Sequence, residues 1–163
     1  MGVGKSTVGK LLADSLNYTF IDLDEHIEKN HGISVSEIFK VKGELYFREM
    51  EYTLLIDLLS KDKQVIALGG GSLENGRINN RIRSSGLLVY LEAGDEFLYH
   101  RLKDEKMKRP LIAGIENENL AEFISTHLEN RLANYQKAHL KVNVENKSPE
   151  EVLSFLTEYL DLS

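Results

Sequence analysis

The sequence predicts a three-layer α/β fold in which helices cover both faces of a parallel sheet. Four short, β-rich runs are almost continuously apolar, at residues 18–24, 64–69, 87–92 and 140–144. Such runs are typical of strands buried on both faces of a parallel sheet. Segments with helical spacing lie between them, with apolar faces formed by Val8, Leu11, Leu12 and Leu16, and by Met50, Leu54, Leu55, Leu58 and Leu59. This alternation favours right-handed crossovers.

Length and composition narrow the classes of protein. A chain of 163 residues suits one domain with a sizeable core. The net charge of −6 argues against nucleic acid as the main partner, because binding a phosphate backbone needs a basic face. There is no cysteine, which excludes disulfides and thiolate metal sites. No apolar run approaches the roughly 20 residues of a spanning helix, and no signal peptide is evident, so we expect a cytoplasmic protein without a membrane partner.

The first seven residues, MGVGKST, match the C-terminal half of the phosphate-loop pattern G-x-x-x-x-G-K-[ST]. The glycines let the backbone wrap round a phosphate, and the following helix offers its positive N-terminal end. Lys5 can reach the β- and γ-phosphates, and the Ser6 hydroxyl can bind Mg²⁺. The alternative is a chance match at a flexible terminus, but an amphipathic helix follows at once, as the motif requires. The motif alone indicates only nucleotide binding.

The first glycine of that pattern, and the strand that normally feeds the loop, would fall before residue 1. Removing a strand from the centre of a parallel sheet would expose two buried neighbours. We therefore expect residues upstream in the natural gene product, or impaired folding and ATP binding without them.

Two carboxylates, Asp22 and Asp24, end the first apolar run. Ligands in such folds lie at the carboxyl ends of the strands, and strand alternation points both side chains the same way. One carboxylate could serve Mg²⁺ through water, and the other could orient and deprotonate an acceptor hydroxyl. An alternative for Asp24 is a helix N-cap.

The segment that follows, 25–42, fits the sheet pattern poorly and is interpreted as an insertion over the sheet edge. A capping box at Ser34–Glu37 starts a short helix within it. Arg48 then lies on a helix, with Glu44 at i−4 and Glu51 at i+3, so a surface ion pair is one explanation of this arginine.

Gly69, Gly70 and Gly71 follow the second apolar run and would permit close approach of a ligand to the backbone.

The polar segment 103–119 is expected to be a mobile loop. Arg109 in that loop could close onto a transferring phosphoryl group, or could be a solvated charge. Arg131, on the next helix, would by itself be taken for a surface residue. A second capping box, Ser148–Glu151, starts the last helix.

Together these segments resemble the shikimate kinase family, in the nucleoside-monophosphate-kinase-like P-loop superfamily. The matching pieces occur in the family's order: GVGKST, FIDLDEHIE, GISVSEIF with GELYFREME, LGGGS, KRPLIAG and NRLANYQKAH. The resemblance implies a P-loop kinase fold whose family has five strands, the first apparently missing here. It also implies a single kinase domain over 1–163, with an acceptor-binding insertion at about 24–52 and a mobile lid at about 103–118.

The resemblance implies transfer of the γ-phosphoryl group of ATP to the 3-hydroxyl of shikimate by a monomer. Asp24 would be the base, and Lys5 and Arg109 would stabilise charge. The residues that would bind ATP are Gly2, Val3, Gly4, Lys5, Ser6, Thr7, Arg101, Arg109 and Lys147. Those that would bind shikimate are Asp24, Arg48, Gly69, Gly70, Gly71 and Arg131, with Arg48 and Arg131 clamping its carboxylate and Glu51 supporting Arg48. Ser6 and Asp22 would hold Mg²⁺.

Two other classes stay open on the residues alone. One is another small-molecule P-loop kinase, of the gluconate or nucleotide type. The other is a non-catalytic module that senses a nucleotide or metabolite, which the incomplete phosphate-loop pattern favours. The five histidines, His26, His31, His100, His127 and His139, show no metal-ligand spacing and are assigned no function.

Overall fold

The structure is a computed structural model that describes residues 1–106 and 110–162. Its elements are α1 (Lys5–Leu16), β1 (Thr19–Asp22), α2 (Leu23–His31), α3 (Val35–Leu59), β2 (Gln64–Ala67), the 3₁₀ turn η1 (Ser72–Glu74), α4 (Gly76–Ser85), β3 (Val89–Glu92), α5 (Asp95–Glu105), α6 (Pro110–Ala113), α7 (Asn117–Tyr135), β4 (Leu140–Asn143) and α8 (Pro149–Leu162). The predicted α/β fold is confirmed, and each of the four apolar runs contains a strand.

The strands pair in parallel, as predicted, but they form two sheets of two strands. In one sheet β1 lies beside β2, with Thr19 opposite Gln64 and Asp22 opposite Ala67. In the other, β3 lies beside β4. Within the described residues β2 and β3 share no ladder. They border a cavity of about 470 Å³ whose lining is largely apolar, including Val65 from β2 and Leu91 from β3.

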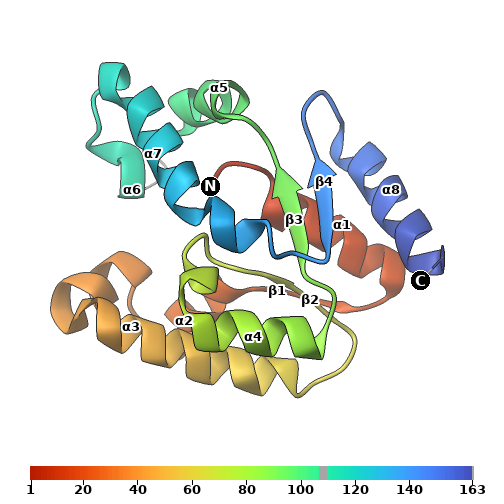
Figure 1. Ribbon diagram of the computed structural model, residues 1–163. Coiled ribbons are helices and arrows are strands. Elements are labelled where there is room, and N and C mark those ends of the chain that lie inside the picture. Colours follow the sequence, from red (N-terminus) through yellow and green to blue (C-terminus); the bar gives the residue numbers. More distant parts are fainter. Residues whose placement is uncertain (107–109, 163) are drawn as a thin grey trace.

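Helices enclose both sheets. In Figure 1, α3 and α4 lie together below β1 and β2, α1 and α8 lie together on the right, and α5, α6 and α7 gather at the upper left. One core cluster joins α1, α5, α7 and α8 to β3 and β4, and a second joins α2, α3 and α4 to β1 and β2. Across residues 1–106 and 110–162, none of the helices combines the length and apolar character needed to cross a membrane.

Local signals explain where several helices begin. Ser34 Oγ accepts a hydrogen bond from the Glu37 N–H at 3.3 Å, while the Glu37 carboxylate accepts from the Ser34 N–H at 3.0 Å, so the predicted capping box is confirmed. The predicted box at Ser148 and Glu151 is also confirmed. The insertion expected over 25–42 is helical, and it joins the rest of α3 through a kink at Gly43, where φ is 82°.

The end of β1 differs from the sequence prediction. The strand stops at Asp22, and Leu23 and Asp24 already belong to α2. The reason is a cap: Asp22 Oδ1 accepts a hydrogen bond from the Asp24 N–H at 3.2 Å, which satisfies a free donor in the first turn of α2. The alternative that Asp24 is the N-cap was therefore wrong, and so was the argument that strand alternation aligns Asp22 with Asp24.

Gly9 provides a test of how tightly α1 packs on β1. A Cβ atom built at Gly9 would lie 2.6 Å from Cε2 of Phe20, closer than real Cβ atoms approach. Gly9→Ala should therefore lower the free energy of unfolding by about 1–3 kcal/mol, despite the better helix propensity of alanine. Urea denaturation measures this. The matched control is Gly76→Ala in α4, where nothing lies within 4 Å of the added atom; equal effects of the two substitutions would contradict the packing account.

Candidate active site

The phosphate loop leads directly into α1. Gly2 and Gly4 have φ values of 73° and 99°, a region that favours glycine, and Gly4 is the N-cap residue of α1. A Cβ at Gly4 would lie 3.7 Å from Nη1 of Arg101, so α5 brings this arginine beside the loop. The Arg101 guanidinium also lies 5.6 Å from the Phe97 ring centroid. The loop therefore presents the start of a helix, with a cation alongside it, to any bound anion.

Ser6 and Asp22 connect the start of α1 to the end of β1. The Ser6 hydroxyl donates a hydrogen bond to Asp22 Oδ2 at 2.7 Å. A hydroxyl and a carboxylate are the oxygen ligands that Mg²⁺ prefers, together with water and substrate phosphates. The donor set therefore fits the expected ion. No cluster of three or more His, Cys, Asp or Glu able to hold a metal occurs in the part of the chain that the structure describes.

Asp24 lies in the first turn of α2, with its carboxylate against the glycine run. Oδ1 lies 2.9 Å from a Cβ built at Gly69. Burial raises the Asp24 pKa to about 6, assisted by the negative charges of Asp22 and Glu51 and opposed by the positive charge of Lys5. A carboxylate with this pKa is ionised at neutral pH and can accept a proton more readily than an ordinary aspartate.

Arg48 projects from α3 towards the same place. Its Nη1 donates to Glu51 at 3.0 Å, and its Nη2 to Glu44 at 3.3 Å, so the ion pairs suggested by the helical spacing exist. The pair with Glu44 lies at the surface, because the Glu44 side chain is 62% exposed. The pair with Glu51 does not, because the Glu51 side chain is 1% exposed and that of Arg48 is 18% exposed. Glu51 also accepts a hydrogen bond from the buried Ser72 hydroxyl at 2.5 Å.

Arg131 approaches from the opposite side, on α7. Its Nε donates to Glu74, and its Nη1 contacts a ring nitrogen of His127. The side chain is 16% exposed, so the reading of Arg131 as a surface residue was wrong. Burial lowers the His127 pKa, and the neighbouring Arg131 charge lowers it further. Neutral His127 can then accept a hydrogen bond from the guanidinium.

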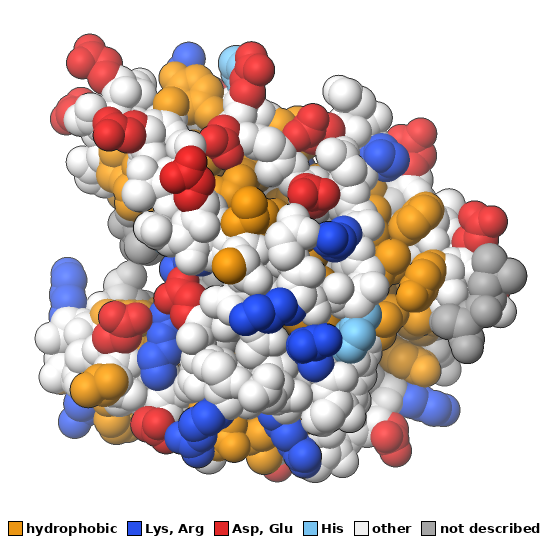
Figure 2. Space-filling model, in the orientation of Figure 1, with side chains coloured by type: hydrophobic (Ala, Val, Ile, Leu, Met, Phe, Trp, Pro, Cys, Tyr) orange, Lys and Arg blue, Asp and Glu red, His pale blue; other side chains and the backbone are white. Residues whose placement is uncertain are grey.

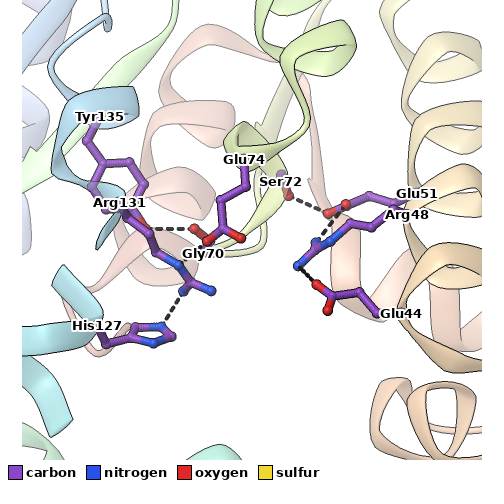
Figure 3. Close-up of polar contacts among 9 residues, drawn as sticks. All are labelled: Glu44, Arg48, Glu51, Gly70, Ser72, Glu74, His127, Arg131 and Tyr135. Carbon is purple, nitrogen blue, oxygen red and sulfur yellow. Dashed lines mark hydrogen bonds and ion pairs between the residues drawn. The ribbon is translucent and has the colours of Figure 1, made fainter. Parts of the chain in front are cut away.

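The three glycines are the point where these groups meet. Figure 3 shows Arg48 and Arg131 approaching from opposite sides, with Gly70 beside Arg131. A Cβ at Gly70 would lie 3.0 Å from Arg131 Nη1, and a Cβ at Gly71 would lie 2.6 Å from Arg48 Nη2 and 3.3 Å from Arg131 Nη2. Their φ values are not positive, so it is these close side-chain tips, and not backbone conformation, that favour glycine here. The sequence predicted that the glycines let a ligand approach the backbone; in the structure the ends of Asp24, Arg48 and Arg131 make such approaches.

Sequence reasoning missed several residues of this cluster. Ser72, Glu74, His127 and Tyr135 all contact it, and the Tyr135 hydroxyl donates to the Gly70 carbonyl at 2.7 Å. His127, Arg131 and Tyr135 are four residues apart, which places them on one face of α7, and this spacing could have grouped them. No local pattern linked Glu74 to Arg131, because 57 positions separate them in the chain.

Two further predicted ATP ligands are Arg109 and Lys147. Arg109 lies outside the described residues. Lys147 is exposed and donates to the Asn143 carbonyl at 2.9 Å, and within 1–106 and 110–162 no described contact joins it to the phosphate loop. Lys5, by contrast, is near enough to Asp24 to lower its pKa. Figure 2 shows the surface hollowed between α6 and α7 above and α3 below, with acidic and basic side chains beside the hollow.

A phosphate loop at a helix start, the half-buried Asp24 carboxylate and two converging guanidiniums define a P-loop phosphotransferase whose acceptor carries an anionic group. Comparisons narrow this class. A model of the shikimate kinase family matches residues 1–161. The shikimate kinase of Flavobacterium johnsoniae is 40% identical over 164 residues, covering 98% of this chain and 94% of that protein. The chain belongs to the shikimate kinase family, as its motifs predicted.

Solved structures agree with this assignment. The crystal structure of shikimate kinase from Bacteroides thetaiotaomicron superposes with a TM-score of 0.93 at 34% identity, covering 99% of this chain and 94% of that one. The shikimate kinase of Acinetobacter baumannii, solved in complex with shikimate, superposes with a TM-score of 0.87 at 30% identity, covering 98% of this chain and 88% of that one.

The raised pKa of Asp24 has a consequence for stability. The folded protein holds this proton with a pKa of about 6, against an ordinary value of 3.8. The bound proton on Asp24 therefore contributes to stability in full below about pH 4, and this contribution is lost as the pH rises through about 6. Asp24→Asn removes the buried charge and should raise the free energy of unfolding at pH 7.5 by about 1–3 kcal/mol.

Urea denaturation at pH 5 and pH 7.5 measures this effect. The control is Asp62→Asn on an exposed loop, which should change stability by less than about 0.5 kcal/mol. A loss of stability for Asp24→Asn at pH 7.5 would show that the Asp24 carboxylate is stabilised in the folded state, contrary to this account.

Proposed function

We propose that the chain transfers the γ-phosphoryl group of ATP to the 3-hydroxyl of shikimate, giving 3-phosphoshikimate and ADP. The observation that carries the proposal is the meeting of Asp24, Arg48 and Arg131 at three consecutive glycines. This arrangement offers one base for a hydroxyl and two cations for a carboxylate within one small space. Membership of the shikimate kinase family supports the same conclusion.

The two arginines would bind the carboxylate of shikimate. A guanidinium presents planar, paired N–H donors that match the oxygens of a carboxylate. Arg48 and Arg131 direct their Nη2 atoms to the same point beside Gly71, so one acceptor carboxylate could engage both. This clamp would hold the ring of shikimate in one orientation, and holding reactants in a reactive geometry lowers the entropic part of the activation barrier.

Asp24 would act on the hydroxyl that is phosphorylated. It accepts the proton as the hydroxyl oxygen bonds to the γ-phosphorus and the bond from that phosphorus to the β–γ bridging oxygen breaks, which releases ADP. The pKa of about 6 makes Asp24 ionised yet basic enough for this step at neutral pH.

The phosphates of ATP would lie on the loop formed by residues 1–7, with Lys5 contributing positive charge. Arg101, beside Gly4, would contribute a second cation on the ATP side. Ser6 and Asp22 would hold Mg²⁺, which neutralises phosphate charge when bound. The ATP contacts of Arg109 and Lys147 and closure of a lid at about 103–118 are further parts of this proposal.

A product assay tests the reaction. ADP release from Mg-ATP would be measured with shikimate, gluconate and AMP offered separately. The proposal expects release that depends on shikimate alone. Release with gluconate or AMP but not shikimate would favour the other kinase types, and calorimetric ATP binding without any ADP release would favour a sensing module.

Replacing the base should abolish turnover while sparing binding. Asp24→Asn should lower kcat by about 10²- to 10⁴-fold, the usual contribution of general base catalysis. Shikimate should still bind measurably by calorimetry, because the clamp is intact. For the unmodified protein, kcat/KM for shikimate should fall as the pH drops below about 6, since Asp24 is then protonated. Unchanged turnover in the variant would remove Asp24 as the base.

Replacing one arm of the clamp should weaken shikimate binding selectively. Arg131→Ala should raise the Kd for shikimate by about 10- to 150-fold, corresponding to about 1.5–3 kcal/mol for a charged hydrogen bond. The Kd for ATP should stay within about twofold. The control is Arg83→Ala, on the exposed surface of α4. An equal loss of affinity for both substrates would point to damage to the fold.

A further inference from the structure

The turn η1 lies between the two arms of the clamp and touches the support of each. It follows the three glycines directly and holds only Ser72, Leu73 and Glu74. Ser72 hydrogen-bonds to Glu51, which supports the Arg48 arm, and Glu74 hydrogen-bonds to the Arg131 arm itself (Figure 3). Two residues separated by a single position therefore contact side chains that come from α3 and α7.

The Arg48 arm is supported through a buried relay. The Ser72 hydroxyl donates to Glu51 Oε1 at 2.5 Å, and Glu51 Oε2 accepts from Arg48 Nη1 at 3.0 Å. Glu51 and Ser72 are both fully buried. A buried carboxylate needs every partner it has, because water cannot replace one. The Ser72 hydroxyl therefore fixes the rotation of the Glu51 carboxylate, and so the place of the Arg48 guanidinium.

The Arg131 arm is supported by a more exposed contact. Glu74 Oε1 accepts from Arg131 Nε, and the Glu74 side chain is 40% exposed. This contact occupies the inner nitrogen of the guanidinium. This contact, together with that of Nη1 with a ring nitrogen of His127, directs the two outer nitrogens towards Gly70 and Gly71, where a Cβ would lie 3.0 and 3.3 Å from them. Those outer nitrogens form the edge that would meet an acceptor carboxylate.

The turn itself is held rigidly. Its backbone donates from Ser72 N–H to the Gly69 carbonyl at 3.2 Å and from Glu74 N–H to the Gly71 carbonyl at 3.0 Å. Leu73, between them, is 7% exposed and packs into the core cluster that includes Leu23 and Ile78. These contacts tie the backbone of Ser72 and Glu74 to the glycines.

We infer that η1 sets the separation and direction of the two clamp guanidiniums, and that Ser72 and Glu74 are positioning residues that select an acceptor bearing a carboxylate. Neither side chain needs to touch the acceptor, since each acts through an arginine. The inference rests on the proposed function, because it concerns the same site and acceptor.

The test compares shikimate with its methyl ester, which keeps the hydroxyls but lacks the carboxylate charge. Ser72→Ala and Glu74→Gln should each lower kcat/KM for shikimate by about 5- to 20-fold, the effect expected when a binding group loses its orientation. The value for the ester should change by less than about threefold, and so should KM for ATP. If Ser72 and Glu74 had a merely structural role, the substitutions would lower kcat/KM for shikimate and for its methyl ester by the same factor.

Matched controls are Ser84→Ala on α4 and Glu122→Gln on α7, which make the same changes at exposed positions. In a protein that already carries Arg48→Ala, adding Ser72→Ala should lower kcat/KM for shikimate little further, because Ser72 acts through that arginine. Glu74→Gln is nearly isosteric and half-exposed, so it keeps the test decisive if Ser72→Ala does not fold.

The outcomes separate the two claims. If the unmodified protein does not prefer shikimate to its ester, or if Arg48→Ala and Arg131→Ala leave that preference intact, the proposed clamp fails and the inference falls with it. If the clamp behaves as proposed but Ser72→Ala and Glu74→Gln retain the full preference, the inference alone is overturned. A preference raised by Glu74→Gln would also overturn it, since Glu74 would then act only as a repelling charge.

Discussion

The candidate site depends on one close approach: functional side chains lie against the backbone at positions 69, 70 and 71, where a Cβ atom would crowd them. Asp24 from α2 fills the space beside Gly69, Arg131 from α7 that beside Gly70, and both arginines that beside Gly71. Side chains from α2, α3 and α7 therefore meet at one short segment of backbone. The parallel register of β1 and β2, which sets Asp22 beside Ala67, brings α2 and the glycine segment to the same end of the sheet. A Cβ at any of these positions would require the tips of the Asp24, Arg48 or Arg131 side chains to shift.

Charge balance is the second requirement of this arrangement. Two guanidiniums close together repel each other, and Glu51 and Glu74 each offset one of them. Asp24 lies near this cluster, no arginine within residues 1–106 and 110–162 is paired with it, and burial raises its pKa to about 6. The site thus pairs the Glu51 and Glu74 carboxylates with arginines and leaves the Asp24 carboxylate with a raised pKa. Burial of the ionised Asp24 lowers the stability of the fold. Such costs are typical of functional sites.

Much of this fold could be predicted because its signals are local. The four apolar runs each contain a strand, both capping boxes form, and the phosphate-loop residues lead into the first turn of α1. The site was harder to predict from the sequence because its contacts join residues that are far apart in the chain. Asp22 caps α2 and ends β1 early, which a strand pattern does not reveal. Arg131 seemed a surface residue because its partners Glu74 and Gly70 lie some 60 positions away. The division into two sheets depends on which strands become neighbours, and the apolar runs do not encode that.

The most direct measurement of the central claim is a crystal structure of this chain with shikimate bound. The account predicts that the carboxylate lies between Arg48 and Arg131 beside Gly71, with both guanidiniums within hydrogen-bond distance, and that a ring hydroxyl lies within about 3.2 Å of the Asp24 carboxylate. A carboxylate bound away from both arginines, or a ring whose hydroxyls all lie beyond reach of Asp24, would contradict it.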